Sequence, residues 1–84
     1  MAFNIVYKKS VERDLKKIDR EEARGILAQI EEDLSSNPRS HPTMKGRFRG
    51  LRRYRAGDYR VIYAVIEKDV LVLRIGHRRD IYRK

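Results

Sequence analysis

Arginine is the residue type in this sequence that is best placed to do chemistry. Residues 51–63 read LRRYRAGDYRVIY and residues 75–83 read IGHRRDIYR. Arg53, Arg60 and Arg78 lie within or directly after strand-like segments, so a concave sheet could gather them around one phosphate. A guanidinium group suits that role because its planar fork makes two parallel hydrogen bonds to phosphate oxygens and keeps its charge. Such a site would stabilise the extra negative charge of a phosphorane-like transition state.

RNA would bring its own nucleophile, the 2′-hydroxyl group, to such a site. The protein would then need to orient this group, help to remove its proton, stabilise the phosphate and protonate the departing 5′-oxygen. This reaction requires no metal ion and no cofactor, and the sequence predicts none. His77 is either the general base or a surface histidine at a strand end.

Other kinds of catalytic site find little support in the composition. The chain has no cysteine, which excludes a thiol nucleophile, a thiolate metal site and disulfides. Its two histidines, His41 and His77, do not form a metal-binding spacing. There is no glycine-rich phosphate loop, and most carboxylates fall in predicted helices, which argues against a magnesium-dependent nuclease.

The basic residues are concentrated in the second half of the chain. The 84 residues include 21 Lys and Arg against 12 Asp and Glu, a net charge of +9, and residues 45–84 carry the whole excess. This asymmetry indicates a surface that faces a polyanion, with nucleic acid favoured over an acidic protein. A membrane surface is disfavoured because the basic residues lie in strand-like segments. The further candidates for RNA binding, each alternatively an ordinary solvated charge, are Lys45, Arg47, Arg49, Arg52, Arg55, His77, Arg79 and Arg83.

One strand, two helices and three strands are predicted to position these side chains. Alternation predicts a strand near residues 3–7, and helical spacing predicts helices near residues 11–18 and 20–36. Ser10 and Asp19 are the expected N-caps, and Asn37-Pro38 ends the second helix. Strand patterns cover residues 51–55, 59–66 and 70–75, with a turn at 56–58 and a polar tail from Gly76.

This order predicts an α+β fold: two N-terminal helices packed on one face of a small, mainly antiparallel four-stranded sheet (β-α-α-β-β-β). At this length, residues 1–84 are expected to form a single domain. The second strand should place Leu51, Arg53 and Arg55 on one face and Arg52 and Tyr54 on the other. The face away from the helices is the candidate binding surface. A cytoplasmic location is expected, because no leader or membrane-spanning run is apparent.

The two arginine-containing segments resemble the RelE/ParE toxin superfamily, and its RelE-like branch in particular. Residues 51–63 are similar to its strand–turn–strand signature, residues 75–83 to its C-terminal motif, and residues 44–46 to the lead-in to the second strand. The resemblance implies a toxin of a type II toxin–antitoxin pair that enters the ribosomal A site, cleaves mRNA and inhibits translation. It also implies a cognate antitoxin as partner, with oligomers formed only through the antitoxin.

The same resemblance implies roles for individual residues. Arg60 is similar to the central-strand arginine that stabilises the phosphate, and Arg78 to the arginine that serves the phosphate and the leaving group. Tyr82 is similar to the C-terminal tyrosine that stacks on or orients the base and assists proton transfer. Arg53 stands where the well-studied bacterial type has a lysine.

The sequence departs from that type at the expected general base. Leu51 occupies the position of a second lysine, and arginine is a poor base because its pKa exceeds ~12. His77, Lys45 and acidification of the 2′-hydroxyl by surrounding arginines remain as alternatives.

Two other functions fit the same segments. A ParE-like toxin would target gyrase and would need no RNA chemistry. A non-catalytic RNA-binding module would bind with salt-dependent affinity and would not cleave.

Overall fold

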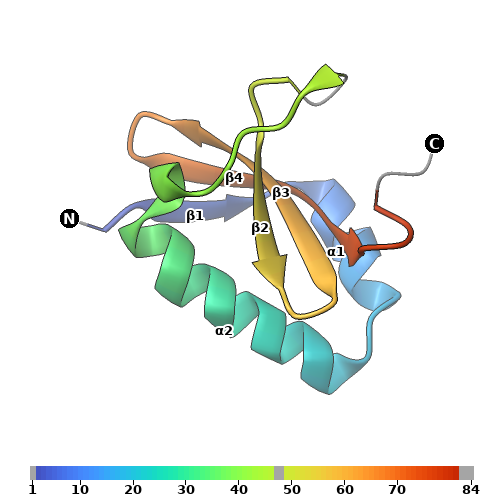
Figure 1. Cartoon of the computed structure of the whole chain (residues 1–84). Helices are drawn as coiled ribbons and strands as arrows, with labels where there is room; N and C mark the ends of the chain where they lie inside the picture. Colours follow the sequence, from blue (N-terminus) through green and yellow to red (C-terminus); the bar gives the residue numbers. More distant parts are fainter. Residues whose placement is uncertain (1, 47–48, 82–84) are drawn as a thin grey trace.

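The computed structural model describes residues 2–46 and 49–81, and its elements follow the predicted order (Figure 1). They are β1 (Asn4–Tyr7), α1 (Lys9–Lys16), α2 (Arg20–Ser36), a short 3₁₀ helix η1 (Pro38–Ser40), β2 (Arg52–Ala56), β3 (Tyr59–Ile66) and β4 (Asp69–His77). No helix in this part of the chain is long and apolar enough to span a membrane.

The four strands form one sheet in the order β1-β4-β3-β2. The β2–β3 and β3–β4 pairs are antiparallel hairpins, whereas β1 runs parallel to β4. The sheet is therefore mostly antiparallel, as predicted. Both helices lie against the sheet in Figure 1, and α2 runs along its whole width.

The core lies between α2 and one face of the sheet, which we call the helix face. Ile26, Ile30 and Leu34 recur every four residues on α2, so they share one side of the helix, and all three are buried. They pack in one cluster with Val61 and Tyr63 of β3. Burying each such aliphatic side chain contributes about 1.5–3 kcal/mol.

Several predicted boundaries shift by one or two residues in the structure, and two of these differences have a clear physical reason. Lys8 is the N-cap of α1, whereas the Ser10 hydroxyl donates a hydrogen bond of 2.6 Å to the Leu73 carbonyl oxygen, so the prediction of Ser10 as a cap was wrong. Asp19 caps α2 as predicted. The last strand extends two residues beyond the prediction, through His77, because its end continues to pair with β3.

Buried tyrosines tie the helix face to the segments packed on it. The Tyr63 hydroxyl donates a hydrogen bond of 2.6 Å to the Pro38 carbonyl oxygen, and burial raises the pKa of this hydroxyl to about 12. The Tyr54 hydroxyl donates to the Asp33 carboxylate on α2. Burial first, and Asp33 second, raise the pKa of Tyr54. These tyrosines therefore stay neutral and structural, and neither offers a ring for stacking on bases.

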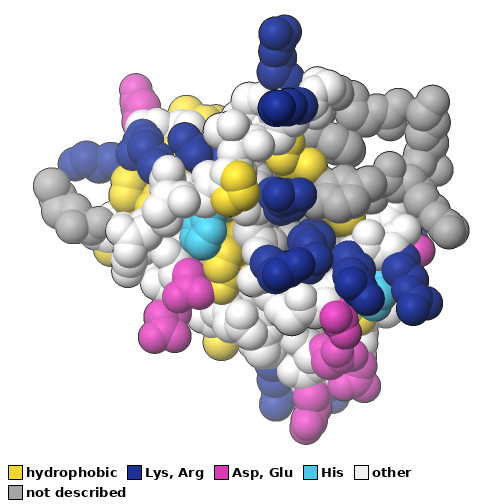
Figure 2. All heavy atoms as spheres, in the orientation of Figure 1, with side chains coloured by type: hydrophobic (Ala, Val, Ile, Leu, Met, Phe, Trp, Pro, Cys, Tyr) yellow, Lys and Arg dark blue, Asp and Glu magenta, His cyan; other side chains and the backbone are white. Residues whose placement is uncertain are grey.

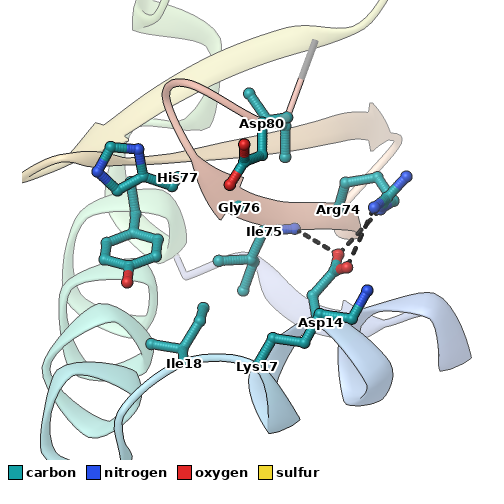
Figure 3. A pocket seen from close by; sticks show the side chains of 10 residues that line it. Asp14, Lys17, Ile18, Arg74, Ile75, Gly76, His77 and Asp80 are labelled. Carbon is teal, nitrogen blue, oxygen red and sulfur yellow. Dashed lines mark hydrogen bonds and ion pairs between the residues drawn. The ribbon is translucent and has the colours of Figure 1, made fainter. Parts of the chain in front are cut away.

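Asp14 binds the edge of β4 at the end of the strand that β1 does not reach. Its carboxylate accepts a hydrogen bond of 2.9 Å from the Ile75 backbone N–H and two from the Arg74 guanidinium, at 2.9 and 3.1 Å (Figure 3). The carboxylate is buried while the Arg74 side chain is half exposed. The hydrogen bonds that Arg74 donates to Asp14 raise the pKa of Arg74. Helix α1 is thus fixed to the strand that carries the C-terminal motif.

Replacing Asp14 with alanine should lower the free energy of unfolding by about 2 kcal/mol, because the Ile75 N–H loses its acceptor at a buried edge. For a domain of this size that change corresponds to a fall in Tm of roughly 10 °C, measurable by thermal denaturation. Asp14→Asn keeps an amide oxygen for the Ile75 N–H and should lose about half as much. A Tm of Asp14→Ala within about 2 °C of the wild type would contradict this role.

Candidate nucleic-acid interface

The sheet face turned away from the helices, which we call the outer face, follows from the strand register. Val61 and Tyr63 point into the core, so their neighbours Arg60, Ile62 and Ala64 point to the opposite side. On this face Arg55 lies directly across from Arg60, and Arg53 lies across from Ile62. Arg53, Arg55 and Arg60 form the arginine cluster.

Arg60 is the central member of this cluster and is only 9% exposed. Its Nη1 donates hydrogen bonds of 3.3 Å to the carbonyl oxygens of Gly57 and Tyr59, so the guanidinium group lies against the β2–β3 turn. Gly57 has a φ of 62°, a left-handed conformation that glycine adopts without strain and that forms this tight turn. Neutral carbonyls hold Arg60 here without neutralising its charge.

The segment after β4 returns to the same turn. The Arg78 backbone N–H donates a hydrogen bond of 2.9 Å to the Asp58 carbonyl oxygen. The Arg60 side chain and the Arg78 backbone therefore bind the carbonyl oxygens of two consecutive residues, Gly57 and Asp58. The predicted turn within residues 56–58 is confirmed, with Gly57 and Asp58 as its turn residues. It contacts both the Arg60 side chain and the backbone of the segment that carries Arg78.

Gly76 lets residues 78–81 fold back onto the sheet. It lies directly across from Arg60 in the register, and a Cβ added there would come within 3.0 Å of Ile81 Cδ1. Ile81 is buried. Residues 78–81, which we call the C-terminal turn, are thus packed beside the strand position that faces Arg60.

The arginines of the outer face and the C-terminal turn carry unneutralised charge. Within residues 2–46 and 49–81, Arg74–Asp14 is the one salt bridge. Figure 2 shows a band of Lys and Arg side chains over β2 and the end of β4, with acidic side chains gathered below it. A surface of this kind attracts a polyanion, and salt weakens the binding between them.

The structure brings some of the sequence-predicted residues together and separates others. Arg53, Arg55 and Arg60 share the outer face, and Arg78 and Arg79 lie in the C-terminal turn beside it. Lys45 and Arg49 lie on the loop that precedes β2 and line a separate hollow there. Arg52 lies on the helix side of β2 and donates a hydrogen bond of 2.7 Å to the His41 carbonyl oxygen. Three predicted residues, Arg47, Tyr82 and Arg83, fall outside the described residues.

Two features of the site were missed from the sequence. Val6, Leu71 and Ala64 are consecutive cross-strand neighbours on the outer face, and together they form an aliphatic row beside the arginine cluster. Val6 is 45% exposed. The row could not be predicted from the sequence, because the register of β1 against β4 determines which residue lies beside Val6. The hydrogen bond that the His77 ring makes is the second feature.

A pocket of about 430 Å³ opens at the edge of β4, and Figure 3 shows it from close by. Asp14, Ile18, His77, Asp80 and Ile81 are among its lining residues, and the arginine cluster contributes none. The basic surface is therefore a face of the sheet with a turn at its end. An extended anion fits such a surface better than a small enclosed ligand does.

The chain is similar in sequence and structure to known toxins. The family model described as the ParE toxin of type II toxin–antitoxin systems matches residues 5–82. Toxin RelG of Mycobacterium tuberculosis is 32% identical over 91 aligned positions that cover all of both chains. In the solved RelBE2 toxin–antitoxin complex of M. tuberculosis, one chain is 25% identical, with a TM-score of 0.86 over 95% of each chain. In the RelB–RelE complex of Methanococcus jannaschii, the match is 27% identical, with a TM-score of 0.71, and covers 92% of this chain and 94% of that one.

Proposed function

The chain belongs to the ParE toxin family of type II toxin–antitoxin systems, and we propose that it is a ribosome-dependent endoribonuclease that cleaves mRNA. One observation carries this proposal. Within the described residues, the buried Arg60 guanidinium has no carboxylate partner and donates to the backbone carbonyl oxygens of Gly57 and Tyr59. The backbone N–H of Arg78 donates to the neighbouring carbonyl oxygen of the same turn. A buried cation without a carboxylate partner is costly unless an anion completes it.

The proposed chemistry is in-line attack of the RNA 2′-hydroxyl oxygen on the adjacent phosphorus. The new bond forms between the 2′-oxygen and phosphorus while the bond to the 5′-oxygen breaks, which leaves a 2′,3′-cyclic phosphate and a 5′-hydroxyl. The 2′-hydroxyl loses a proton and the leaving 5′-oxygen gains one. The guanidinium groups of Arg60 and Arg78 would bind the non-bridging oxygens, where negative charge accumulates in the transition state.

Proton removal from the 2′-hydroxyl would depend on the same positive charge. Arg53 and Arg55 lie on the outer face next to Arg60, and neither forms an ion pair within the described residues. Concentrated positive charge stabilises the alkoxide and so lowers the pKa of the hydroxyl group. This account agrees with the leucine at position 51, where the RelE-like bacterial type has a lysine.

Primer extension on mRNA incubated with purified ribosomes and the protein tests the proposal. We expect discrete cleavage stops within the reading frame that require ribosomes. Adding the purified antitoxin from the neighbouring gene should abolish them. Intact mRNA in the presence of translating ribosomes would refute the endoribonuclease assignment.

A second candidate function, poisoning of gyrase, is favoured by the ParE description of the matching family. Such a toxin would bind a protein and would make no use of a phosphate site on the outer face. DNA breaks and an SOS response on expression, without mRNA cleavage, would select this alternative.

We propose that the antitoxin covers the aliphatic row together with the arginine cluster. Ile66 continues the outer face beyond Ala64 and is 54% exposed. Aliphatic side chains offer nothing to a phosphate backbone, so a partner for this half of the face must be a protein. A segment that carries both aliphatic and acidic side chains complements the two halves at once.

Placing a glutamate at Val6 or Ile66 should weaken antitoxin binding at least tenfold, because a charge would be buried against apolar contacts. Ala28→Glu adds the same charge at an exposed position of α2 and should leave the affinity unchanged. Isothermal titration calorimetry with the antitoxin segment measures both effects. Equal affinities for Val6→Glu, Ile66→Glu and Ala28→Glu would show that the antitoxin binds elsewhere.

A further inference from the structure

His77 organises the C-terminal turn through both its backbone and its ring. The backbone N–H groups of Asp80 and Ile81 donate hydrogen bonds of 2.8 and 2.9 Å to its carbonyl oxygen. The Arg79 N–H donates a hydrogen bond of 3.1 Å to its ring nitrogen Nδ1. Three consecutive amides of the turn therefore depend on one residue, and the first of them depends on the side chain.

This hydrogen bond determines which ring nitrogen carries a proton. A nitrogen that accepts from a backbone N–H must itself be unprotonated, so in the neutral ring the proton lies on Nε2. Tyr59, the register partner of His77 on β3, packs edge-on against the ring with centroids 5.5 Å apart and an interplanar angle of 79°. Figure 3 shows the His77 ring at one side of the pocket. The basic lone pair of the imidazole is thus already used inside the protein.

We propose that His77 is a positioning residue whose Nδ1 holds the C-terminal turn and its two arginines in place, and that it is not the general base. The proposal rests on the proposed endoribonuclease function for its effect on rate. Its structural part, the link between the ring and the Arg79 amide, stands independently of that function.

The effect on the arginines follows from the chain geometry. Arg78 is flanked by two anchors: its own N–H is bound to the Asp58 carbonyl oxygen, and the next N–H is bound to the His77 ring. Losing the second anchor loosens the peptide that follows Arg78, while the Asp80 and Ile81 amides stay bound to the His77 carbonyl oxygen. A displacement of about 1 Å at a reacting group costs up to about 100-fold in rate, so the loss should be visible kinetically.

Three substitutions separate positioning from base catalysis. His77→Asn places an amide oxygen where Nδ1 lies, so it keeps an acceptor for the Arg79 N–H but has no basic nitrogen. His77→Gln places its amide at the distance of Nε2 and loses that acceptor, and His77→Ala loses both. We expect His77→Asn to retain single-turnover mRNA cleavage within about threefold of the wild type, with an unchanged pH profile. His77→Gln and His77→Ala should fall by about tenfold or more.

A second measurement does not depend on activity. Hydrogen exchange of the Arg79 amide, followed by NMR, should be slow in the wild type and in His77→Asn and faster in His77→Gln and His77→Ala. The ¹⁵N shifts of the wild-type ring should report a proton on Nε2. The same spectra show whether each variant is folded.

The outcomes distinguish failure of this inference from failure of the proposed function. If the wild type cleaves mRNA but His77→Asn loses as much activity as His77→Gln and the pH profile changes, His77 is a base and the inference is wrong. If the wild type does not cleave, the endoribonuclease proposal fails. Exchange of the Arg79 amide then decides whether the His77 ring holds the C-terminal turn. Equal Arg79 exchange in all four proteins, or a ring proton on Nδ1, would overturn the positioning role.

Discussion

Replacing Arg60 with alanine is expected to reduce ribosome-dependent mRNA cleavage by more than about 100-fold, the usual cost of removing a charged partner of the transition state. The side chain is buried and its guanidinium group is fixed against the β2–β3 turn, so the exposed Arg53 and Arg55 should not replace it. Single-turnover cleavage of ribosome-bound mRNA measures the loss. The effect should appear in the rate of cleavage more than in binding to the ribosome.

Two matched variants test why Arg60 matters. Arg60→Lys keeps the charge but replaces the planar fork with a single ammonium, so it should recover only part of the activity. Arg24 is exposed on α2, and Arg24→Ala removes one positive charge far from the outer face with no expected effect. Folding of Arg60→Ala should be preserved, because its two hydrogen bonds to backbone carbonyls are long, at 3.3 Å. Near-normal cleavage by folded Arg60→Ala would show that Arg60 does not take part in the reaction.

Arg78→Ala is expected to have the second large effect, again about 100-fold on the cleavage rate. The substitution removes the guanidinium group but keeps the backbone N–H that binds the Asp58 carbonyl oxygen, so the C-terminal turn should remain in place. A loss of activity then reports on the side chain alone. Single-turnover cleavage measures it under the conditions used for Arg60→Ala.

The neighbouring residue provides the control for this variant. Arg79→Ala also removes one guanidinium from the C-terminal turn and keeps the backbone bond to the His77 ring. We expect it to lose no more than about tenfold, mostly through weaker binding, and to lose less at high salt. Equal losses for Arg78→Ala and Arg79→Ala would mean that the turn contributes only general positive charge.

Residue patterns were sufficient to predict the layers of this fold. Helical spacing predicted a helix over residues 20–36, whose buried side carries Ile26, Ile30 and Leu34, and strand patterns predicted the three C-terminal strands. Arg53 and Arg55 could be placed together on the face opposite Tyr54 for the same reason. Local periodicity determines such faces, because helices and strands repeat their side-chain directions regularly.

Long-range partners could not be predicted in this way. Ser10 has the chemistry of an N-cap, yet its hydroxyl bonds to Leu73, which is 63 residues away, because α1 packs on β4. Asp14 looked like one of many helix carboxylates, and only the exposed edge of β4 makes it a buried acceptor. The pairing of Arg60 with Arg55 could not be predicted because it depends on the register of the β2–β3 hairpin. A slip of one residue in that register would move the side chains of one strand to the opposite face.

The proposed mechanism requires that Arg60 and Arg78 act on the same phosphate. The direct measurement is a structure of the protein on a ribosome whose mRNA has a 2′-deoxynucleotide at the cleavage site, which removes the nucleophile and preserves the bound state. We predict that both guanidinium groups lie within about 3.2 Å of the non-bridging oxygens of that one phosphate. The account would be contradicted if the two side chains contacted different phosphates, or if the outer face pointed away from the mRNA.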